Sequence, residues 1–125
     1  MDFQKIRDRA LYIRRWLKAR PEKEIVVVSH GGFLHFLTDD WEDGSTGWAN
    51  TECRTYEFLP DGNDSELEDA MIQETVESRQ CRGKFGPPPT RASQKELCGL
   101  ILQGWADQGY AIREGNSVED EIKLR

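Results

Sequence analysis

The sequence predicts an α/β fold in which a few-stranded, mostly parallel sheet is flanked by helices. Three observations lead to this prediction. A helical apolar pattern covers residues 3–19, a continuous β-branched run follows at Ile25–Ser29, and the pair Gly31-Gly32 then precedes a second apolar run. The order helix, strand, glycine turn and helix is typical of α/β proteins. The 125 residues allow one domain, with no room for a (β/α)₈ barrel or a two-domain enzyme.

The first element is an amphipathic helix over residues 3–19. Its apolar positions recur every three or four residues, as on one face of a helix; they are Phe3, Ile6, Ala10, Ile13 and Leu17. Asp2 can cap the amino terminus, and Pro21 ends the helix near Arg20. The opposite face is basic. We interpret that face as a solvated surface, with a binding surface for an acidic partner as the alternative.

Two strands and a second helix follow. Ile25–Ser29 is apolar on both faces, which favours a central strand of a parallel sheet covered on both sides. Phe33–Leu37 is interpreted as a short buried helix, and residues 38–50 as a loop rich in Asp, Gly and Trp. Residues 51–59 predict a second strand. Arg54, Tyr56 and Phe58 would point one way and Cys53, Thr55 and Glu57 the other, so we expect this strand to be less buried and nearer the edge of the sheet.

The rest of the chain is less apolar. Residues 60–89 are acidic and end in Gly86-Pro87-Pro88-Pro89; a possible capping box at Ser65–Glu68 predicts a short helix over residues 66–79, in a segment that we expect to be mobile or loosely docked. A last helix starts at Thr90 or Ser93, runs to about Asp107 and stops at Gly109. The predicted regions are an α/β core at 1–59, an acidic, proline-ended linker at 60–89, a C-terminal helix at 90–110 and a polar tail at 111–125.

Composition and charge argue against several classes of protein. The longest apolar run is about five residues, which is too short for a membrane span or a secretory signal. Residues 26–80 hold two basic and 13 acidic side chains, so we expect no nucleic-acid partner. The three cysteines have neither disulfide-framework nor zinc-ligand spacing, which fits a reducing cytosol. We therefore expect a cytoplasmic protein without a metal, a cofactor or a membrane partner.

The candidate site lies where the predicted strand ends. His30 follows Ser29 directly, and Gly31 and Gly32 open the next helix. The first N–H groups of a helix have no partner within it, and glycines let an anion approach the backbone closely. A histidine adds a hydrogen-bond donor and a positive charge when protonated. These residues predict a phosphate or oxyanion site, although a purely structural turn is the more common role of such a sequence.

A resemblance favours the phosphate site. The run Glu24–Leu34 (EIVVVSHGGFL) resembles the second-histidine motif of the histidine phosphatase superfamily, which has the phosphoglycerate mutase-like fold. Residues 49–53 resemble the family's final Asn-plus-strand segment, and the PPPTRASQKE…GWADQGY stretch is similar to the carboxyl-terminal extension of fungal members. The resemblance implies a partial three-layer sandwich, in which His30 contacts the phosphoryl group of a phosphate monoester and Asn50 lies at the rim of the site.

The sequence departs from the family in one decisive respect. The family's chemistry begins with an Arg-His-Gly motif whose histidine is phosphorylated, and no Arg-His pair occurs in this chain. Covalent transfer needs that nucleophile, cationic groups and an acid. The candidates for the acid are loop carboxylates, with a solvated role as the alternative: Asp39, Asp40 and Glu42. Trp41 and Trp48 are candidates for the mouth of the site, with packing as the alternative, and His35 faces elsewhere as a structural or surface residue.

The expected function follows from this incomplete set. We expect the carboxyl-terminal portion of a histidine phosphatase-like protein, acting on a phosphorylated small molecule only when the missing half completes it and inactive as this chain alone. The alternative is a non-catalytic remnant of the fold that binds an anion or another protein. The exposed edge of the Ile25–Ser29 strand would in either case invite self-association or another partner.

Overall fold

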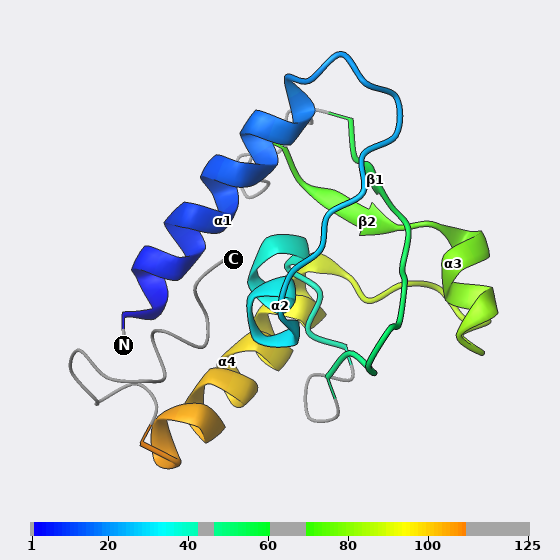
Figure 1. Cartoon of the computed structure of the whole chain (residues 1–125). Helices are drawn as coiled ribbons and strands as arrows, with labels where there is room; N and C mark the ends of the chain where they lie inside the picture. Colours follow the sequence, from blue (N-terminus) through cyan, green and yellow to red (C-terminus); the bar gives the residue numbers. More distant parts are fainter. Residues whose placement is uncertain (1, 43–46, 61–69, 110–125) are drawn as a thin grey trace.

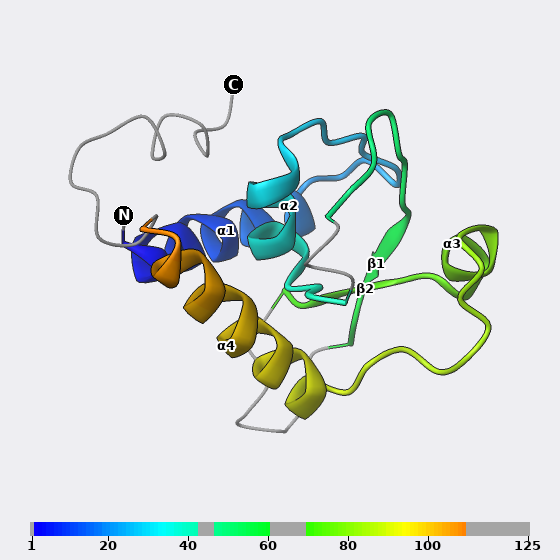
Figure 2. The same ribbon diagram turned by 90° about the horizontal axis from the view of Figure 1, so that it is seen from below.

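The structure of the chain is a computed structural model, and it describes residues 2–42, 47–60 and 70–109. In chain order its elements are α1 (Phe3–Lys18), α2 (Gly31–Thr38), β1 (Tyr56–Phe58), β2 (Ile72–Glu74), α3 (Val76–Cys81) and α4 (Arg91–Asp107). Helices α1, α2 and α4 gather on one side of the molecule, and the two strands with α3 lie on the other (Figures 1 and 2). The architecture is therefore mixed α/β.

Helix α1 confirms the first prediction almost residue for residue. The side chain of Asp2 accepts hydrogen bonds from the backbone N–H groups of Gln4 (2.9 Å) and Lys5 (3.4 Å), which satisfies two of the donors that a helix start leaves free. Ile6 and Ala10 are buried on the predicted apolar face. The helix ends at Lys18, three residues before Pro21.

The core lies between α1, α2 and α4. It contains Ile6 and Ala10 from α1, Phe33, Phe36 and Leu37 from α2, Trp41, and Cys98 from α4. The ring of Phe36 packs edge-on against Trp41 with 5.1 Å between ring centroids, and Trp105 of α4 lies 6.0 Å from Trp41. The buried Arg14 of α1 donates to the carbonyl oxygens of Phe36 (3.2 Å) and Leu37 (3.0 Å) near the end of α2. Those bonds tie α2 to α1.

The sheet is small and antiparallel. Strand β1 pairs with β2 so that Tyr56 lies opposite Glu74 and Phe58 opposite Ile72. Two backbone hydrogen bonds extend the ladder beyond the strands, from Leu59 N to Met71 O (2.8 Å) and from Thr75 N to Thr55 O (2.9 Å). The second predicted strand is thus confirmed only for residues 56–58 of the predicted 51–59, and as part of an antiparallel pair.

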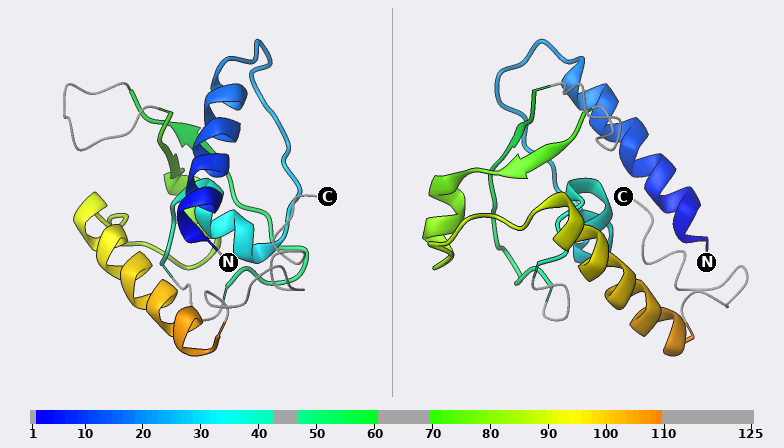
Figure 3. Two further views of the ribbon diagram at one scale, coloured as in Figure 1. Left: turned by 90° about the vertical axis from the view of Figure 1, so that its left-hand side faces the viewer. Right: turned by 180° about the vertical axis from the view of Figure 1, so that it is seen from behind.

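The prediction for Ile25–Ser29 is not met in the described residues. The segment forms neither strand nor helix, and its aliphatic side chains are exposed: Ile25 by 41%, Val26 by 89%, Val27 by 42% and Val28 by 83%. It runs along the side of the molecule away from the two strands (Figure 3, left). A strand requires a neighbour for its backbone hydrogen bonds. No parallel sheet is present within the described ranges to provide one.

The region after residue 69 also differs from the prediction. The proposed helix over residues 66–79 is wrong for residues 70–75, because β2 occupies residues 72–74, and it is confirmed only for residues 76–79, since α3 begins at Val76. Thr75 caps α3 by accepting from the backbone N–H of Ser78 at 3.1 Å, which is a local N-terminal signal of its own. Ala70 and Met71 are buried, so this part of the acidic stretch is docked. The capping box at Ser65–Glu68 falls outside the described residues.

Helix α4 resolves the choice between two predicted starts. Thr90 is the N-cap and accepts from the backbone N–H of Ser93 at 3.1 Å, so the helix begins at Arg91. It ends at Asp107, and Gly109 takes the left-handed conformation (φ 91°) that follows many helices. The predicted polar tail lies outside the described residues. Among the helices that the structure describes, none combines the length and the apolar character needed to span a membrane.

Candidate functional site

The predicted phosphate site is the start of α2. His30 is its N-cap, has an extended backbone (φ -86°, ψ 149°) and exposes its side chain to solvent. No side chain caps this helix, whereas Asp2, Thr75 and Thr90 cap the other three described helices. The first helical hydrogen bond runs from Leu34 N to His30 O (2.9 Å), so the N–H groups of residues 31–33 have no partner within the helix. An anion is a suitable partner for such groups.

The two glycines keep this helix start accessible. A Cβ placed on Gly32 would meet no other atom within 4 Å, and one placed on Gly31 would meet only Trp48, at 3.9 Å. The structure therefore brings Trp48, predicted as a rim residue, to the beginning of α2. Asn50 is exposed in the same loop, two residues after Trp48. The predicted residues His30, Gly31 and Trp48 thus lie together across a sequence separation of 18 residues.

Arg54 joins this group, and the sequence interpretation had not selected it. Its guanidinium lies over the indole of Trp48, 4.0 Å from the ring centroid, and its Nε donates to a carboxylate oxygen of Glu52. The side chain is only 2% exposed. The alternation of residues 51–59 was a usable signal, since it places Arg54 on the same face of the strand as Tyr56, and Tyr56 stacks on Trp48 (6.2 Å between centroids).

Three buried polar atoms around the start of α2 lack a hydrogen-bond partner among the described residues. They are Ser29 Oγ, Trp48 Nε1 and Arg54 Nη1. Buried donors are normally satisfied by protein, by ordered water or by a ligand. Nη1 of Arg54 and Nε1 of Trp48 can only donate, and Arg54 carries a permanent positive charge. Ser29, which precedes the uncapped helix by two residues, and the loop that contains Trp48 and Arg54 therefore carry further polar groups that an anion can satisfy.

Trp41 does not lie at a site rim. Its side chain is 1% exposed and stacks on His35 with 5.4 Å between ring centroids, within the core. His35 is also buried, and its Nδ1 lies 3.0 Å from the carbonyl oxygen of Asp40. Burial lowers the pKa of His35, because the charged form is poorly solvated there. His35 is a structural residue, as one alternative of the prediction had it.

Asp40 is a buried hydrogen-bond centre, in contrast to the solvated carboxylate that the loop composition suggested. Its Oδ2 accepts from the hydroxyl of Tyr56 (2.8 Å), and its Oδ1 accepts from Gln94 Nε2 (3.2 Å) and from the backbone N–H of Glu42 (3.3 Å). Burial, followed by the charge of Asp40, raises the pKa of Tyr56, so the phenol remains a donor. Asp40 links α2, β1 and α4 and has a structural role.

The other two candidate acids are held by cations. A carboxylate oxygen of Asp39 lies 2.6 Å from Nη1 of Arg91. Glu42 lies 3.3 Å from Nη1 of Arg79 and 3.5 Å from Nζ of Lys84. Asp39 is thus ion-paired with α4, and Glu42 is ion-paired with α3 and with the connection between α3 and α4. Nothing in their contacts directs either of them toward His30.

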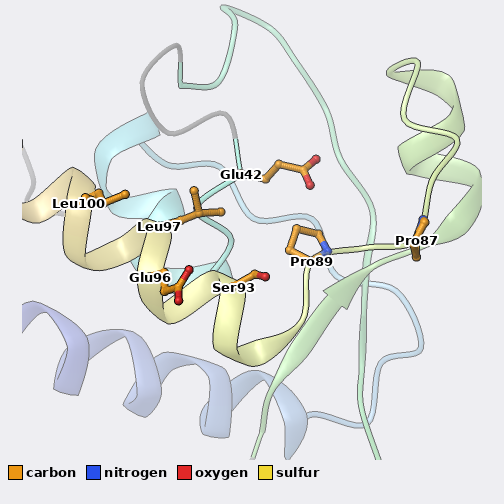
Figure 4. A pocket seen from close by; sticks show the side chains of 7 residues that line it. All are labelled: Glu42, Pro87, Pro89, Ser93, Glu96, Leu97 and Leu100. Carbon is orange, nitrogen blue, oxygen red and sulfur yellow. The ribbon is translucent and has the colours of Figure 1, made fainter.

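Neither of two hollows in the described part of the molecule contains the His30-Gly31-Gly32 group. One of these hollows, of about 400 Å³, lies beside α4 and the Pro87–Pro89 segment that leads into it (Figure 4). It is lined by Glu42, Pro87, Pro89, Ser93, Glu96, Leu97 and Leu100. Another hollow, of about 180 Å³, lies between the strands β1 and β2, the start of α4 and the Pro88–Thr90 segment that precedes α4. Within the described ranges, no three His, Cys, Asp or Glu side chains gather as a metal site. The candidate anion site thus lies outside both hollows.

Comparison with known proteins adds no relative. The chain matches no family model, and no curated protein or solved structure is significantly similar to it.

Proposed function

We propose that this chain contributes the phosphate-binding, second-histidine part of a histidine phosphatase-like protein that acts on phosphate monoesters. The observation that carries the proposal is the start of α2, where an exposed histidine precedes backbone N–H groups that have no partner within the helix. The resemblance of Glu24–Leu34 to the family's motif assigns the same residues to the phosphoryl group. Two independent lines of argument thus select His30, Gly31 and Gly32.

The residues present can bind and orient a phosphoryl group. The N–H groups of residues 31–33 can donate to its oxygens, and the dipole of α2 favours a negative charge at this end. The imidazole of His30 supplies a further donor and, when protonated, a charge. Arg54 lies on the neighbouring loop, held against Trp48 and paired with Glu52. Together the helix start and His30 form a donor-rich end of the helix.

The same residues cannot complete the family's reaction. A phosphohistidine intermediate requires a second histidine as the nucleophile, and His35, the only other histidine of the chain, is buried in the core. The chain by itself is therefore expected to bind phosphate without hydrolysing a phosphate monoester. Hydrolysis of an aryl phosphate by the purified chain, lost on His30→Ala substitution, would contradict this part of the proposal.

The second candidate function is a non-catalytic anion-binding or protein-interaction module. The exposed aliphatic segment Ile25–Val28 favours it, because a binding module can present such an edge to a partner. The two candidates share the anion site and differ in what completes it. Addition of a polypeptide that carries the Arg-His-Gly half of a family member should restore phosphatase activity only under the first.

A phosphate titration followed by nuclear magnetic resonance tests the shared site. Inorganic phosphate at millimolar concentration should shift the amide signals of residues 31–33 and the imidazole signals of His30. The amides at the start of α4 are the internal control, since Thr90 already caps that helix. Chloride at equal ionic strength is the control for general screening. Absence of shifts at residues 31–33 would exclude phosphate binding at α2.

A matched pair of variants separates anion binding from helix stability. His30→Asp places a carboxylate where it can cap α2 and repel phosphate, so it should abolish the shifts while stabilising the helix by about 1 kcal/mol. His30→Asn should cap the helix without the added negative charge, and should weaken binding less than Asp. Unchanged phosphate binding in His30→Asp would show that the anion site is elsewhere.

A further inference from the structure

The segment Ile25–Ser29 has the properties of a strand without a partner. Its exposure alternates with a period of two, because Ile25 and Val27 are about 40% exposed whereas Val26 and Val28 are more than 80% exposed. No backbone N–H or C=O group between residues 25 and 29 makes a hydrogen bond with another described residue. An exposed row of aliphatic side chains beside unpaired backbone groups is a ready surface for strand pairing.

The sequence of this segment is complementary to itself in the antiparallel direction. When a second copy is related by a two-fold axis through Val27, Val26 lies opposite Val28 of the second copy, and Val28 lies opposite Val26 of the second copy. In the same register Glu24 lies opposite His30 of the second copy at both ends. Glu24, Val26, Val28 and His30 share one face, because successive side chains of a strand alternate.

The complementarity concerns both shape and charge. β-Branched residues that face each other across an antiparallel pair stabilise it, and like charges in that position destabilise it. A carboxylate of Glu24 can accept a hydrogen bond from the imidazole of His30, so each end of the pair carries a favourable contact. A shift of the register by two residues would replace the two Val26–Val28 contacts by a single Val26–Val26 or Val28–Val28 contact and would lose both Glu24–His30 contacts. The chemistry of the segment therefore selects one occupant and one register.

We propose that two copies of this chain pair through residues 24–30 as an antiparallel two-stranded ladder centred on Val27. The pairing satisfies the backbone of Ile25–Ser29 and covers Val26 and Val28. The pairing does not rest on the proposed phosphate site, but it places Glu24 of the second copy against His30. Phosphate and dimerisation are therefore expected to compete for His30, which gives the two proposals separable readouts.

Sedimentation equilibrium up to about 1 mM chain tests the dimer. The double substitution V26K/V28K sets two lysines opposite two lysines and should weaken dimerisation by about tenfold or more. V26T/V28T preserves β-branching without charge and should weaken it by less. Tyr12→Lys alters another exposed apolar side chain (71% exposed), on α1, and should have no effect. Because all three positions are exposed, monomers of these variants should keep the wild-type circular dichroism spectrum.

A charge-swap cycle tests the register. Glu24→Lys and His30→Glu should each weaken the dimer, because they set like or unmatched groups opposite each other. The double variant E24K/H30E restores a pair of opposite charges and should recover most of the wild-type dimerisation. Recovery is expected only if residues 24 and 30 face each other across the interface.

Three results would overturn the proposal. A wild-type chain that remains monomeric at 1 mM would exclude the dimer, and a V26K/V28K variant that dimerises like the wild type would exclude this segment as the interface. Amide protection of Ile25–Ser29 that appears only after addition of a different polypeptide would assign the edge to that partner. Phosphate binding at residues 31–33 that persists in V26K/V28K would leave the proposed function standing in each case.

Discussion

Two apolar runs lie within one stretch of 13 residues, and one of them is buried whereas the other is exposed. Phe33–Leu37 is largely buried in α2, with Phe33 fully inaccessible to solvent, whereas Val26 and Val28 of the preceding run are more than 80% exposed. Hydrophobicity does not separate them, because Ile25–Val28 is entirely aliphatic. The difference lies in the backbone. A helix makes its backbone hydrogen bonds within itself and needs only other elements packed against its apolar face. An extended segment needs a neighbouring strand as well, because its backbone groups have no partners of their own.

The largest expected effect compares the two runs directly. Phe33→Ala removes a fully buried ring of the core, and should lower the free energy of unfolding by about 3–5 kcal/mol. Val28→Ala, measured at low micromolar concentration where the chain is monomeric, should change it by less than about 0.5 kcal/mol. Urea unfolding followed by circular dichroism provides both values. A cost of Val28→Ala close to that of Phe33→Ala would mean that the segment is buried in solution.

The next effect concerns the attachment of α2 to α1. Arg14 is 3% exposed and donates to the carbonyl oxygens of Phe36 and Leu37. Arg14→Met keeps an unbranched side chain but leaves these acceptors without a charged donor, and should cost about 2–3 kcal/mol in urea unfolding. Arg9→Met on the exposed part of the same helix is the control, with less than about 0.5 kcal/mol expected. Equal costs for Arg14→Met and Arg9→Met would show that Arg14 does not help to hold Phe33–Leu37 in the core.

A smaller effect is expected where the chain leaves α2. Tyr56→Phe deletes the hydroxyl that donates to Asp40 Oδ2 and leaves a buried carboxylate oxygen short of one donor. The loss should be about 1–2 kcal/mol in the free energy of unfolding. Tyr12→Phe, at a 71% exposed position, is the matched control and should be close to neutral. A neutral Tyr56→Phe would show that Gln94 and the backbone of Glu42 suffice for Asp40.

The smallest effect is a dependence on pH that arises within the buried run. Burial lowers the pKa of His35 below its ordinary value of about 6.5, so below that pH the unfolded chain binds a proton that the folded chain resists. The free energy of unfolding should therefore fall as the pH decreases below 6.5. His35→Phe can keep the stacking on Trp41 and should make this fall shallower. An identical slope in the variant would contradict the burial of a neutral imidazole.

The helices were the most predictable part of this fold. The apolar period gave α1 within one residue of its end, and Asp2, Thr90 and Gly109 marked boundaries that the structure confirms. These signals are local, because caps and periodicity act within a few residues. The sheet was less predictable. The β-branched character of Ile25–Ser29 indicated an extended segment, yet pairing depends on residues far away in the sequence.

The candidate site followed the same division. His30, Gly31 and Gly32 were found from the sequence because a histidine and two glycines at a helix start are a local pattern. Arg54 was missed, since its approach to Trp48 is a contact between loop and strand that only packing reveals. Trp41 was a candidate for the mouth of the site, with packing as the alternative. The structure shows the packing, because the Trp41 side chain is buried in the core beside Trp105 of α4.

The sequence by itself determined the boundaries of α1 and the end of α4, the residues that start α2 without a cap, and the segment that is extended and aliphatic. Only the tertiary structure decided that Asp40 and His35 are buried, that Arg54 lies beside the site, and that the most aliphatic segment remains uncovered. The physical reason is the range of the interactions. Capping and helix periodicity act over a few residues, whereas burial and strand pairing depend on partners from distant parts of the chain.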